Sequence, residues 1–448
     1  MEENKDLELV KELLEKKQYT KLRQMLSDKN TADIAVILEE LAEEDLLKIF
    51  RILPKTMAAD VFSYLEVDHQ HELITSMSEK DAAGIINNLM ADDATDLLEE
   101  MPANIVKKIL ANANPDIRRD INHLLRYPED SAGSIMTVEY VDLKETMTVE
   151  DAIERIRKVG MDSETINICY VLDAKRKLIG TVALRYLLIS PSDAVIGEIM
   201  HEDVIFINTM MDQEEVARQF QKYDFTAMPV VDNEERLVGI ITVDDIVDIL
   251  QEEATEDITK MAAMSPSEQS YFETSVFSHA KHRIAWLLVL MFSATITGTI
   301  ITRYEDAFAA IPLLVSFIPM LMDTGGNCGS QSATLVIRGI ALNEIQFHDL
   351  FKVVFKEFRV SLIVGVALAV ANGIRILIMY HDTMLALVIG CSLVITIVLS
   401  KLIGCILPLL ARKVNLDPAI MASPLITTMV DTCSILVYFS IATRVFNL

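Results

Sequence analysis

Hydrophobic positions recur at helical spacing from Leu7 to about Asn122. Within this stretch a short theme returns at irregular intervals of about 23 to 26 residues, where an apolar helix ends and an acidic one begins. Its three copies start at Leu41, Val67 and Met90. A helical unit that returns at this spacing is typical of stacked helical hairpins, so the pattern predicts a small superhelical domain.

The helical pattern breaks at Tyr127 to Ala132, and two similar copies of about 60 residues follow. Each copy reads helix, strand, strand, helix, and a charged turn separates the two Val- and Ile-rich strands, at 174–177 and at 233–236. The pattern predicts two α+β units in tandem. The aligned starts of the helix, the first strand and the second strand are Met147 with Met211, Tyr170 with Val230, and Leu178 with Val238.

The second copy ends in an acidic helix that begins near Asp244 and leads to Met264. The sequence Ser265-Pro-Ser-Glu then predicts a restart with a capping box and a proline at the first helical position. The new helix is expected to pass Tyr271 and Phe272 and to enter the membrane after Lys281. A stiff connector of this kind can transmit movement, although an ordinary juxtamembrane helix gives the same pattern.

The remaining chain contains apolar runs whose lengths fit five membrane spans. The expected spans are Ala285 to Thr302, Ala307 to Met322, Ser361 to Tyr380, Met384 to Leu410 and Pro418 to Thr443. A cytosolic N-terminus satisfies the positive-inside rule. It leaves Arg303 and Arg444 outside and places these basic residues inside: Lys281, Arg283, Arg338, Lys352, Lys356, Arg359, Arg412 and Lys413.

Two features inside the spans indicate an ion route. Asp431 stands alone in an apolar run, and such a carboxylate usually faces a bundle interior or a water-filled path, although a protonated, hydrogen-bonded Asp is the alternative. The second span is short, contains Pro312 and Pro319, and precedes Asp323-Thr-Gly-Gly-Asn. We expect this interrupted segment to expose backbone carbonyls that can line an ion path.

Charge is divided unevenly along the chain. Residues 1–280 contain 57 Asp or Glu and 28 Lys or Arg (net −29), whereas residues 281–448 contain 9 and 12 (net +3), which sums to −26. A polyanionic surface repels nucleic acid and makes hard divalent cations plausible ligands. The five cysteines show no zinc-type spacing, and the charged N-terminus has no signal-peptide core, so we expect the soluble part in the cytosol.

The tandem units resemble a pair of cystathionine-beta-synthase (CBS) domains, a regulatory module that often binds adenosine nucleotides or metal ions. In nucleotide-binding members a Ser or Thr and an Asp three residues later hold the ribose, and Thr242 and Asp245 occupy these positions. The first copy departs from the pattern with Ala183 and Tyr186. The resemblance therefore implies one possible ATP site, with which a metal reading of Asp245 competes.

Taken together, the acidic helical domain, the CBS pair, Gly325 to Gly339 (GGNCGSQSATLVIRG) and Asp417 to Asp431 (DPAIMASPLITTMVD) resemble the MgtE family of magnesium channels and transporters. The resemblance covers essentially the whole chain. It implies a mainly α protein with a helical superhelix at 1–129, tandem α+β CBS domains at 130–253, a connector helix at 254–280 and a five-helix transmembrane domain at 281–448.

The family further implies a homodimer in the cell membrane, with a cytoplasmic N-terminus, one central pore and cytosolic domains that sense Mg²⁺. Asp431 matches the pore aspartate, and two copies would face each other across the two-fold axis. The positions that match the family's regulatory metal ligands are Asp60, Asp92, Asp96, Glu214, Asp224, Asp245, Asp248, Glu253 and Asp257, and Asp417 is a further expected metal ligand. On this hypothesis Mg²⁺ bridges the acidic faces and closes the pore.

Other functions remain as alternatives. An exchanger that couples divalent cations to protons or sodium is the main one, and a CBS-regulated carrier for organic solutes is another. An enzyme is a poor choice, because the sequence contains no phosphate loop, Ser-His-Asp order or zinc-spaced histidines. Selectivity among Mg²⁺, Co²⁺, Ni²⁺ and Mn²⁺ does not follow from carboxylate and carbonyl ligands.

Overall fold

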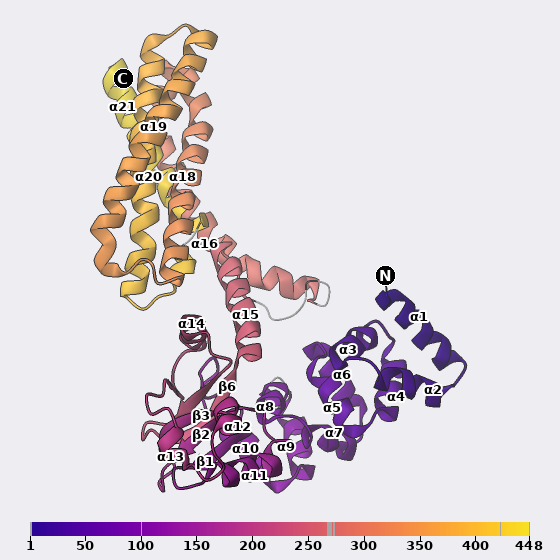
Figure 1. Cartoon of the computed structure of the whole chain (residues 1–448). Coiled ribbons are helices and arrows are strands. Elements are labelled where there is room, and N and C mark those ends of the chain that lie inside the picture. Colours follow the sequence, from indigo (N-terminus) through magenta and orange to yellow (C-terminus); the bar gives the residue numbers. More distant parts are fainter. Residues whose placement is uncertain (1, 100, 267–270, 272–273, 422, 448) are drawn as a thin grey trace. The chain divides into compact units, whose positions relative to one another are not determined.

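The structure is a computed structural model that describes residues 2–447 except 100, 267–270, 272–273 and 422 (Figure 1). The chain forms two compact units, Met1–Gln251 and Glu252–Leu448, which are described separately below. The first unit combines short helices with two small sheets, and the second is helical throughout its described residues. The predicted mainly α architecture is confirmed.

The helical superhelix follows a strict repeat. After α1 (Glu2–Glu15), helices begin every 12 residues, and each packs on the helix two positions away along the chain, so that odd and even helices form two layers. The period of the predicted theme is therefore 24 residues, without the expected irregularity. The repeated helices are α2 (Tyr19–Ser27), α3 (Thr31–Glu39), α4 (Glu43–Ile52), α5 (Lys55–Ser63), α6 (Val67–Ser76), α7 (Glu79–Ile86), α8 (Ala91–Glu99), α9 (Ala103–Asn112) and α10 (Pro115–Leu124).

Each of the tandem copies contains a three-stranded sheet, in which the first strand pairs parallel to the second and the second antiparallel to the third. The short first strand of each sheet was not expected from the sequence. The first copy contains β1 (Tyr140–Lys144), α11 (Val149–Val159), β2 (Thr165–Leu172), β3 (Leu178–Ala183), α12 (Leu184–Ile189) and α13 (Ile196–Ile199). The second contains β4 (Ile207–Asn208), α14 (Gln213–Tyr223), β5 (Ala227–Val231), β6 (Leu237–Thr242) and α15 (Val243–Met261).

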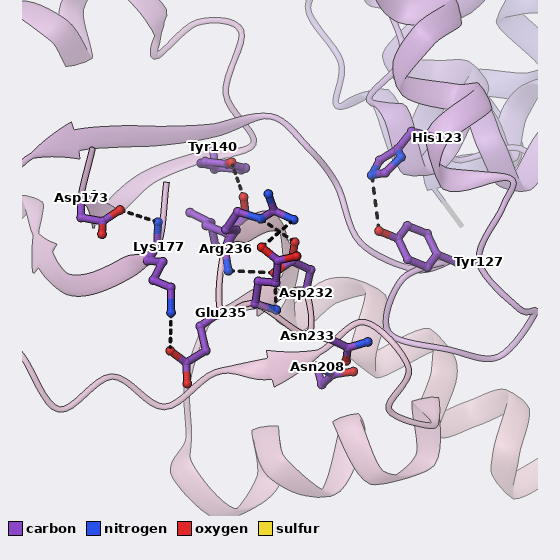
Figure 2. A network of polar contacts seen from close by, with 12 residues as sticks. His123, Tyr127, Tyr140, Asp173, Lys177, Asn208, Asp232, Asn233, Glu235 and Arg236 are labelled. Atoms are coloured by element: carbon purple, nitrogen blue, oxygen red, sulfur yellow. Dashed lines mark hydrogen bonds and ion pairs between the residues drawn. The ribbon is translucent and has the colours of Figure 1, made fainter. Parts of the chain in front are cut away.

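The two predicted charged turns meet and join the copies (Figure 2). Asp173 and Asp232 occupy equivalent places, and each carboxylate accepts two backbone N–H groups of its own turn. Across the joint, Lys177 pairs with Glu235 at 3.2 Å between Nζ and Oε2. Tyr170 and Leu237, from the two sheets, share one buried cluster. The pair is thus a single packed body, as the internal repeat predicts.

The connector is only partly described. Helix α15 continues the second copy as far as Met261, and α16 (Val276–Thr302) begins after Ser275, whose side chain caps it. The predicted restart at Ser265 lies mostly outside the described residues, as do Phe272 and the glutamate of the expected capping box. The backbone N–H of Ser265 donates to the carbonyl of His282, which folds this segment back onto α16.

The second unit contains five long helices in its described residues. Four of them are long and apolar enough to cross a membrane, namely Val276–Thr302, Phe347–Tyr380, Thr383–Lys413 and Pro418–Phe446. The membrane-domain elements are α16, α17 (Glu305–Ala310), the 3₁₀ segment η1 (Pro312–Phe317), α18 (Ile318–Ala341), η2 (Phe347–Asp349), α19 (Leu350–Tyr380), α20 (Thr383–Lys413), η3 (Pro418–Met421) and α21 (Ser423–Phe446).

The predicted second span, 307–322, is wrong in its bounds. The helix is interrupted at η1, between Pro312 and Pro319, as these prolines predict, and α18 then runs without a break to Ala341. The glycines of α18 serve helix packing. A Cβ at Gly404 of α20 would lie 2.3 Å from the carbonyl oxygen of Gly329, so the backbones of α18 and α20 touch here.

Candidate functional site

A polar stripe runs along the exposed side of α18 in the membrane unit. Its members are spaced by four, four, three and four residues, which keeps them on one helix face. They are Asp323, Asn327, Gln331, Thr334 and Arg338, all exposed in the single chain. The opposite side of α18 is buried against α20 and α21. Because lipid cannot satisfy such groups, the stripe marks a surface that meets water or another protein surface.

Asp431 of α21 lies beside this stripe. Its Oδ1 atom is buried and has no hydrogen-bond partner, and the charge of Asp323 is near enough to act on its carboxyl group. The helix is held in place by Val430, which packs on α18 at Gly325 and Gly329, and by Thr432, whose hydroxyl lies 2.8 Å from that of Thr297 on α16. A fixed carboxylate with an unused oxygen can bind a cation.

The end of α15 contacts the same helices. Met261 packs against a small apolar cluster that contains Ala333 of α18 and Val430 of α21. Next to it, the Lys260 ammonium lies 2.7 Å from a carboxylate oxygen of Asp417, just before η3. The predicted metal ligand Asp417 is therefore engaged by a lysine. These contacts connect the connector directly to the helices that carry the polar stripe and Asp431.

A second candidate site lies in the first unit, where α8 of the superhelix approaches the CBS pair. Ala91 belongs to the same apolar cluster as Met136 and Ile246, so packing brings the first turn of α8 to the start of α15. This contact gathers carboxylates from five parts of the sequence. We call the following set the acidic cluster: Asp60, Asp92, Asp93, Glu139, Glu164, Asp244 and Asp245.

Burial and mutual repulsion raise the pKa values of Asp92, Asp93, Glu164 and Asp245 in the acidic cluster. Asp92 is only 8% exposed, and burial, followed by the charges of Asp245 and Asp93, holds its pKa well above the usual range. Although Asp93 is exposed as a residue, the protein around its carboxyl desolvates it and, with Asp245, raises its pKa to about 6. Desolvation and Asp244 raise the pKa of Glu164 to about 7.

The described residues contain no group of three or more His, Cys, Asp or Glu side chains arranged to hold a metal ion. The acidic cluster is thus a concentrated negative field rather than a finished coordination shell. Mg²⁺ usually keeps several of its waters and binds through one or two carboxylates, so such a field suits a hydrated ion. A cation there would relieve the repulsion that raises these pKa values.

Thr242 and Asp245, the predicted ribose ligands, lie together at the start of α15. The Thr242 hydroxyl donates to Asp245 Oδ2 at 2.8 Å, and the Thr242 backbone N–H donates to the same oxygen at 3.3 Å. Burial raises the pKa of Asp245 to about 6, against the lowering effect of the Thr242 hydrogen bonds. Asp245 therefore belongs to both the predicted nucleotide site and the acidic cluster.

The other predicted metal ligands lie elsewhere or at the margin of the acidic cluster. Asp96 is one turn beyond Asp92 on α8, and Asp248 is one turn beyond Asp245 on α15. Glu214 is in the first turn of α14 and pairs with Arg218, whereas Asp224 ends that helix in the left-handed conformation (φ 53°). Further along α15 are Glu253 and Asp257. Metal binding by these residues stays a prediction.

The sequence interpretation missed Glu139, Glu164 and Asp323. The two glutamates precede β1 and β2 of the first CBS copy, and the backbone N–H of Glu164 donates to the carbonyl of Glu139. No local signal distinguishes them, since only the fold brings them to Asp245. Asp323 could have been found, because the four-residue spacing of polar positions is visible in the sequence.

Comparison with known proteins identifies the family. A profile described as "Divalent cation transporter" (MgtE) matches residues 318–441, "MgtE intracellular N domain" matches 29–130, and "CBS domain" matches 132–192 and 196–252. The magnesium transporter MgtE of Thermus thermophilus is 36% identical over 437 residues, 97% of each chain. The chain belongs to the MgtE family. The MgtE of Bacillus subtilis is 34% identical, over 94% of this chain and 95% of its own.

Solved structures of MgtE family members match the first part of the chain. The cytosolic domain of the Mg²⁺ channel MgtE in complex with ATP is 38% identical, with a TM-score of 0.52, and the match covers 54% of this chain and 98% of that one. The soluble part of a magnesium transporter matches with a TM-score of 0.54 at 31% identity, over 56% and 99%. The chain is thus a membrane protein of this transporter family.

Proposed function

We propose that this chain carries Mg²⁺ through the cell membrane into the cytosol, as a channel that cytosolic Mg²⁺ closes. The observation that carries the proposal is Asp431, a fixed carboxylate with an unused oxygen beside the polar stripe of α18. The amide and hydroxyl side chains of Asn327, Gln331 and Thr334 can accept hydrogen bonds from the water molecules around a hydrated ion. Mg²⁺ dehydrates reluctantly, so a path that keeps its water shell lowers the barrier to entry.

The path is completed by a second copy. In one chain the polar stripe is exposed, and lipid against five polar or charged side chains is costly. A two-fold related copy would present the same stripe across an axis, so that two Asp431 carboxylates flank one ion. The named relatives are magnesium transporters, which supports Mg²⁺ as the substrate.

The acidic cluster is the sensor in this proposal. At low cytosolic Mg²⁺ its carboxylates repel, which favours separation of α8 from the start of α15. At high Mg²⁺ the ion neutralises them and favours the closed arrangement. Helix α15 runs from Asp245 to Met261, and Met261 contacts α18 and α21, so a shift of this helix reaches the ion path. Many weak sites give a steep response, because each adds a modest preference for one state.

ATP is a second regulatory ligand. The support is the ATP complex of the related cytosolic domain, together with Thr242 and Asp245 at the family's ribose positions. Because Asp245 also belongs to the acidic cluster, a nucleotide there would change the field that Mg²⁺ meets. A Thr242→Val variant should bind ATP more weakly in calorimetry, with Mg²⁺ inhibition of the pore largely retained.

The decisive experiment measures Mg²⁺ flux into proteoliposomes, with a Mg²⁺-sensitive dye inside and defined Mg²⁺ on the sensor side. Wild type should conduct at low sensor Mg²⁺ and close at high. Asp431→Ala should lose flux. Asp382→Ala, at the N-terminus of the neighbouring helix α20, is the matched control and should keep it. Preserved flux in Asp431→Ala removes this residue from the ion path.

Gating is tested in the same vesicles. Neutralising Asp245 and Asp248 together should leave the pore conducting at high sensor-side Mg²⁺, and unchanged inhibition would reject the sensor assignment. Flux that requires a proton or sodium gradient would instead support the ion-coupled exchanger. A membrane potential alone should drive the flux of a channel.

A further inference from the structure

The membrane unit contains a buried charge network that the ion path does not use. Lys401 of α20 is 4% exposed, Glu357 of α19 is 8% exposed, and Ser332 of α18 is fully buried. The Ser332 hydroxyl donates to Glu357 Oε2 at 2.6 Å and accepts from Lys401 Nζ at 3.1 Å. Lys401 Nζ lies 3.7 Å from the same carboxylate oxygen. Three helices thus meet at one neutral network, which we call the Ser332 network.

The Ser332 network acts on the rotation of α18 about its own axis. Ser332 follows Gln331 of the polar stripe, and successive helical residues point about 100° apart, so a bond to Ser332 fixes where Gln331 points. One turn earlier, Gly329 contacts the backbone of α20 at Gly404, three residues after Lys401. Packing of the buried face of α18 sets its rotation approximately. The hydrogen bonds of Ser332 add directional contacts that fix it more closely.

Charge balance makes the network sensitive to the loss of one member. A buried ion pair is roughly neutral in its net contribution, because the attraction only offsets the desolvation of both groups. Removing one partner leaves the other charge buried and unpaired, which favours any movement that hydrates this charge or gives it a new partner. Such a movement would change the position of α18, because Ser332 is hydrogen-bonded to both charges.

We propose that Glu357 and Lys401 are positioning residues for ion transport: through Ser332 they hold α18 in the rotation that turns its polar stripe toward the ion path. The inference deepens the proposed function and rests on it only for the flux measurements. Neither residue needs to contact the ion. Loss of either charge should rotate or tilt α18, whereas loss of both together should leave a neutral contact and a nearly native stripe.

The first test reads the rotation without any transport. Single cysteines are placed at Asn327, Gln331 and Leu335 of full-length protein in detergent, and reaction with a charged thiol reagent is followed by peptide mass spectrometry, which also separates the native cysteines. Otherwise wild-type protein should react at 327 and 331. Glu357→Gln and Lys401→Met should each change the relative rates among the three positions about tenfold or more. The double variant should return to the original pattern.

The second test reads flux of two divalent cations, Mg²⁺ and Co²⁺, through the same variants. Fewer folded molecules would lower both rates equally, so the ratio of the rates reports the geometry of the path. Each single variant should lower Mg²⁺ flux on the order of 10- to 100-fold and change the ratio. The double variant should recover both. Lys352→Met, an exposed lysine of α19, is the matched control.

The outcomes decide the proposal as follows. Unchanged labelling in the single variants overturns it, and so does a double variant that fails to recover or fails to fold. Single variants that do not fold, with a double variant that folds and labels like wild type, support it. If wild type carries no Mg²⁺, the proposed function fails, while the labelling test of the Ser332 network still stands.

Discussion

The two units of this protein place their carboxylates in opposite surroundings. In the membrane unit, the buried Glu357 and the partly buried Asp417 each lie against a lysine. In the first unit, the acidic cluster gathers Asp92, Asp93 and Asp245 among further acids, and the charges that act on them most are other carboxylates. The two lysine-paired acids are therefore balanced without a cation, whereas the repulsion within the acidic cluster falls only when protons or cations bind.

This difference assigns separate tasks to similar side chains. Paired carboxylates hold helices in position and change little with the ion concentration. Unpaired, crowded carboxylates respond to it, because every added cation or proton lowers their mutual repulsion. Asp431, with its unused Oδ1, resembles the acids of the acidic cluster although it lies in the membrane unit. The contrast predicts opposite signs for charge removal in the two units.

The largest effect is expected in the membrane unit. Glu357→Gln should destabilise it by roughly 3 to 5 kcal/mol, because Lys401 is left as a buried charge without its counter-ion. Unfolding of full-length protein by SDS titration measures the change. Glu344→Gln, an exposed acid between α18 and η2, is the control and should have little effect. Equal stability of the two variants would contradict the claim that Glu357 balances the buried charge of Lys401.

The next effect is a pH dependence of the stability of the first unit. Folded pKa values of about 6 for Asp93 and Asp245 and about 7 for Glu164 lie above their ordinary values near 4. The folded state therefore retains protons that the unfolded state releases between about pH 4 and 7, so stability falls as pH rises through this window. Allowing for partial exposure, residues 1–251 should lose roughly 1 to 3 kcal/mol from pH 5 to 7.5.

Denaturant unfolding of residues 1–251 at both pH values measures this change. Acids with lowered pKa values, such as Asp151 and Asp232, lose their stabilising effect only below about pH 4, so they do not oppose it. Added Mg²⁺ should reduce the pH effect, because it stabilises the folded state most where the carboxylates are ionised. If the first unit becomes more stable with rising pH, the proposed repulsion within the acidic cluster is contradicted.

A smaller effect of opposite sign to Glu357→Gln is expected for Asp92→Asn. Replacing this buried acid by a neutral side chain of similar shape should stabilise residues 1–251 by about 0.5 to 2 kcal/mol at pH 7.5. The same unfolding experiment measures it. Glu72→Gln, an exposed acid within α6, should stay close to wild type. Destabilisation by Asp92→Asn would show that the Asp92 carboxylate makes a favourable interaction that outweighs its repulsion by the other acids of the acidic cluster.

The smallest effect concerns the connector. Lys260→Gln removes a partly buried ion pair with Asp417, which is worth about 0.5 to 1 kcal/mol. If this pair favours one gating state, the Mg²⁺ concentration for half-inhibition should shift by about two- to fivefold. Flux in proteoliposomes checks the shift, with Lys352→Gln as the control. A shift of zero would contradict a role of this ion pair in gating.

Periodic features of the fold were predictable from the sequence. The theme at Leu41, Val67 and Met90 marks the starts of α4, α6 and α8, and the aligned strands at Tyr170 and Val230 lie in β2 and β5. The strand β4 was missed because it has only two residues, and β1 was missed because its sequence, YVDLK, lacks the run of Val and Ile that marks the other strands. Pro312 and Pro319 indicated the interruption at η1, but the bounds of the helix after it do not follow from the sequence pattern, since glycine in a membrane helix permits close packing without a break.

The candidate site was predictable only where a family motif or a regular spacing identified it. Asp431 and the Asp92 and Asp245 positions follow from motifs, whereas Glu139 and Glu164 reach the acidic cluster through the pairing of β1 with β2. The Ser332 network joins residues that are 25 and 69 positions apart. Such contacts depend on helix packing, which no local pattern encodes.

The 12-residue spacing of helices in the superhelix has a consequence for how this domain can change its length. Alternate helices occupy alternate layers, so removing 24 residues, one pair, returns every later helix to its own layer. Removing 12 would exchange the layers and turn Asp92 away from Asp245. The superhelix can therefore be lengthened or shortened by whole pairs of helices, while its last helices still present the same acids to the CBS pair.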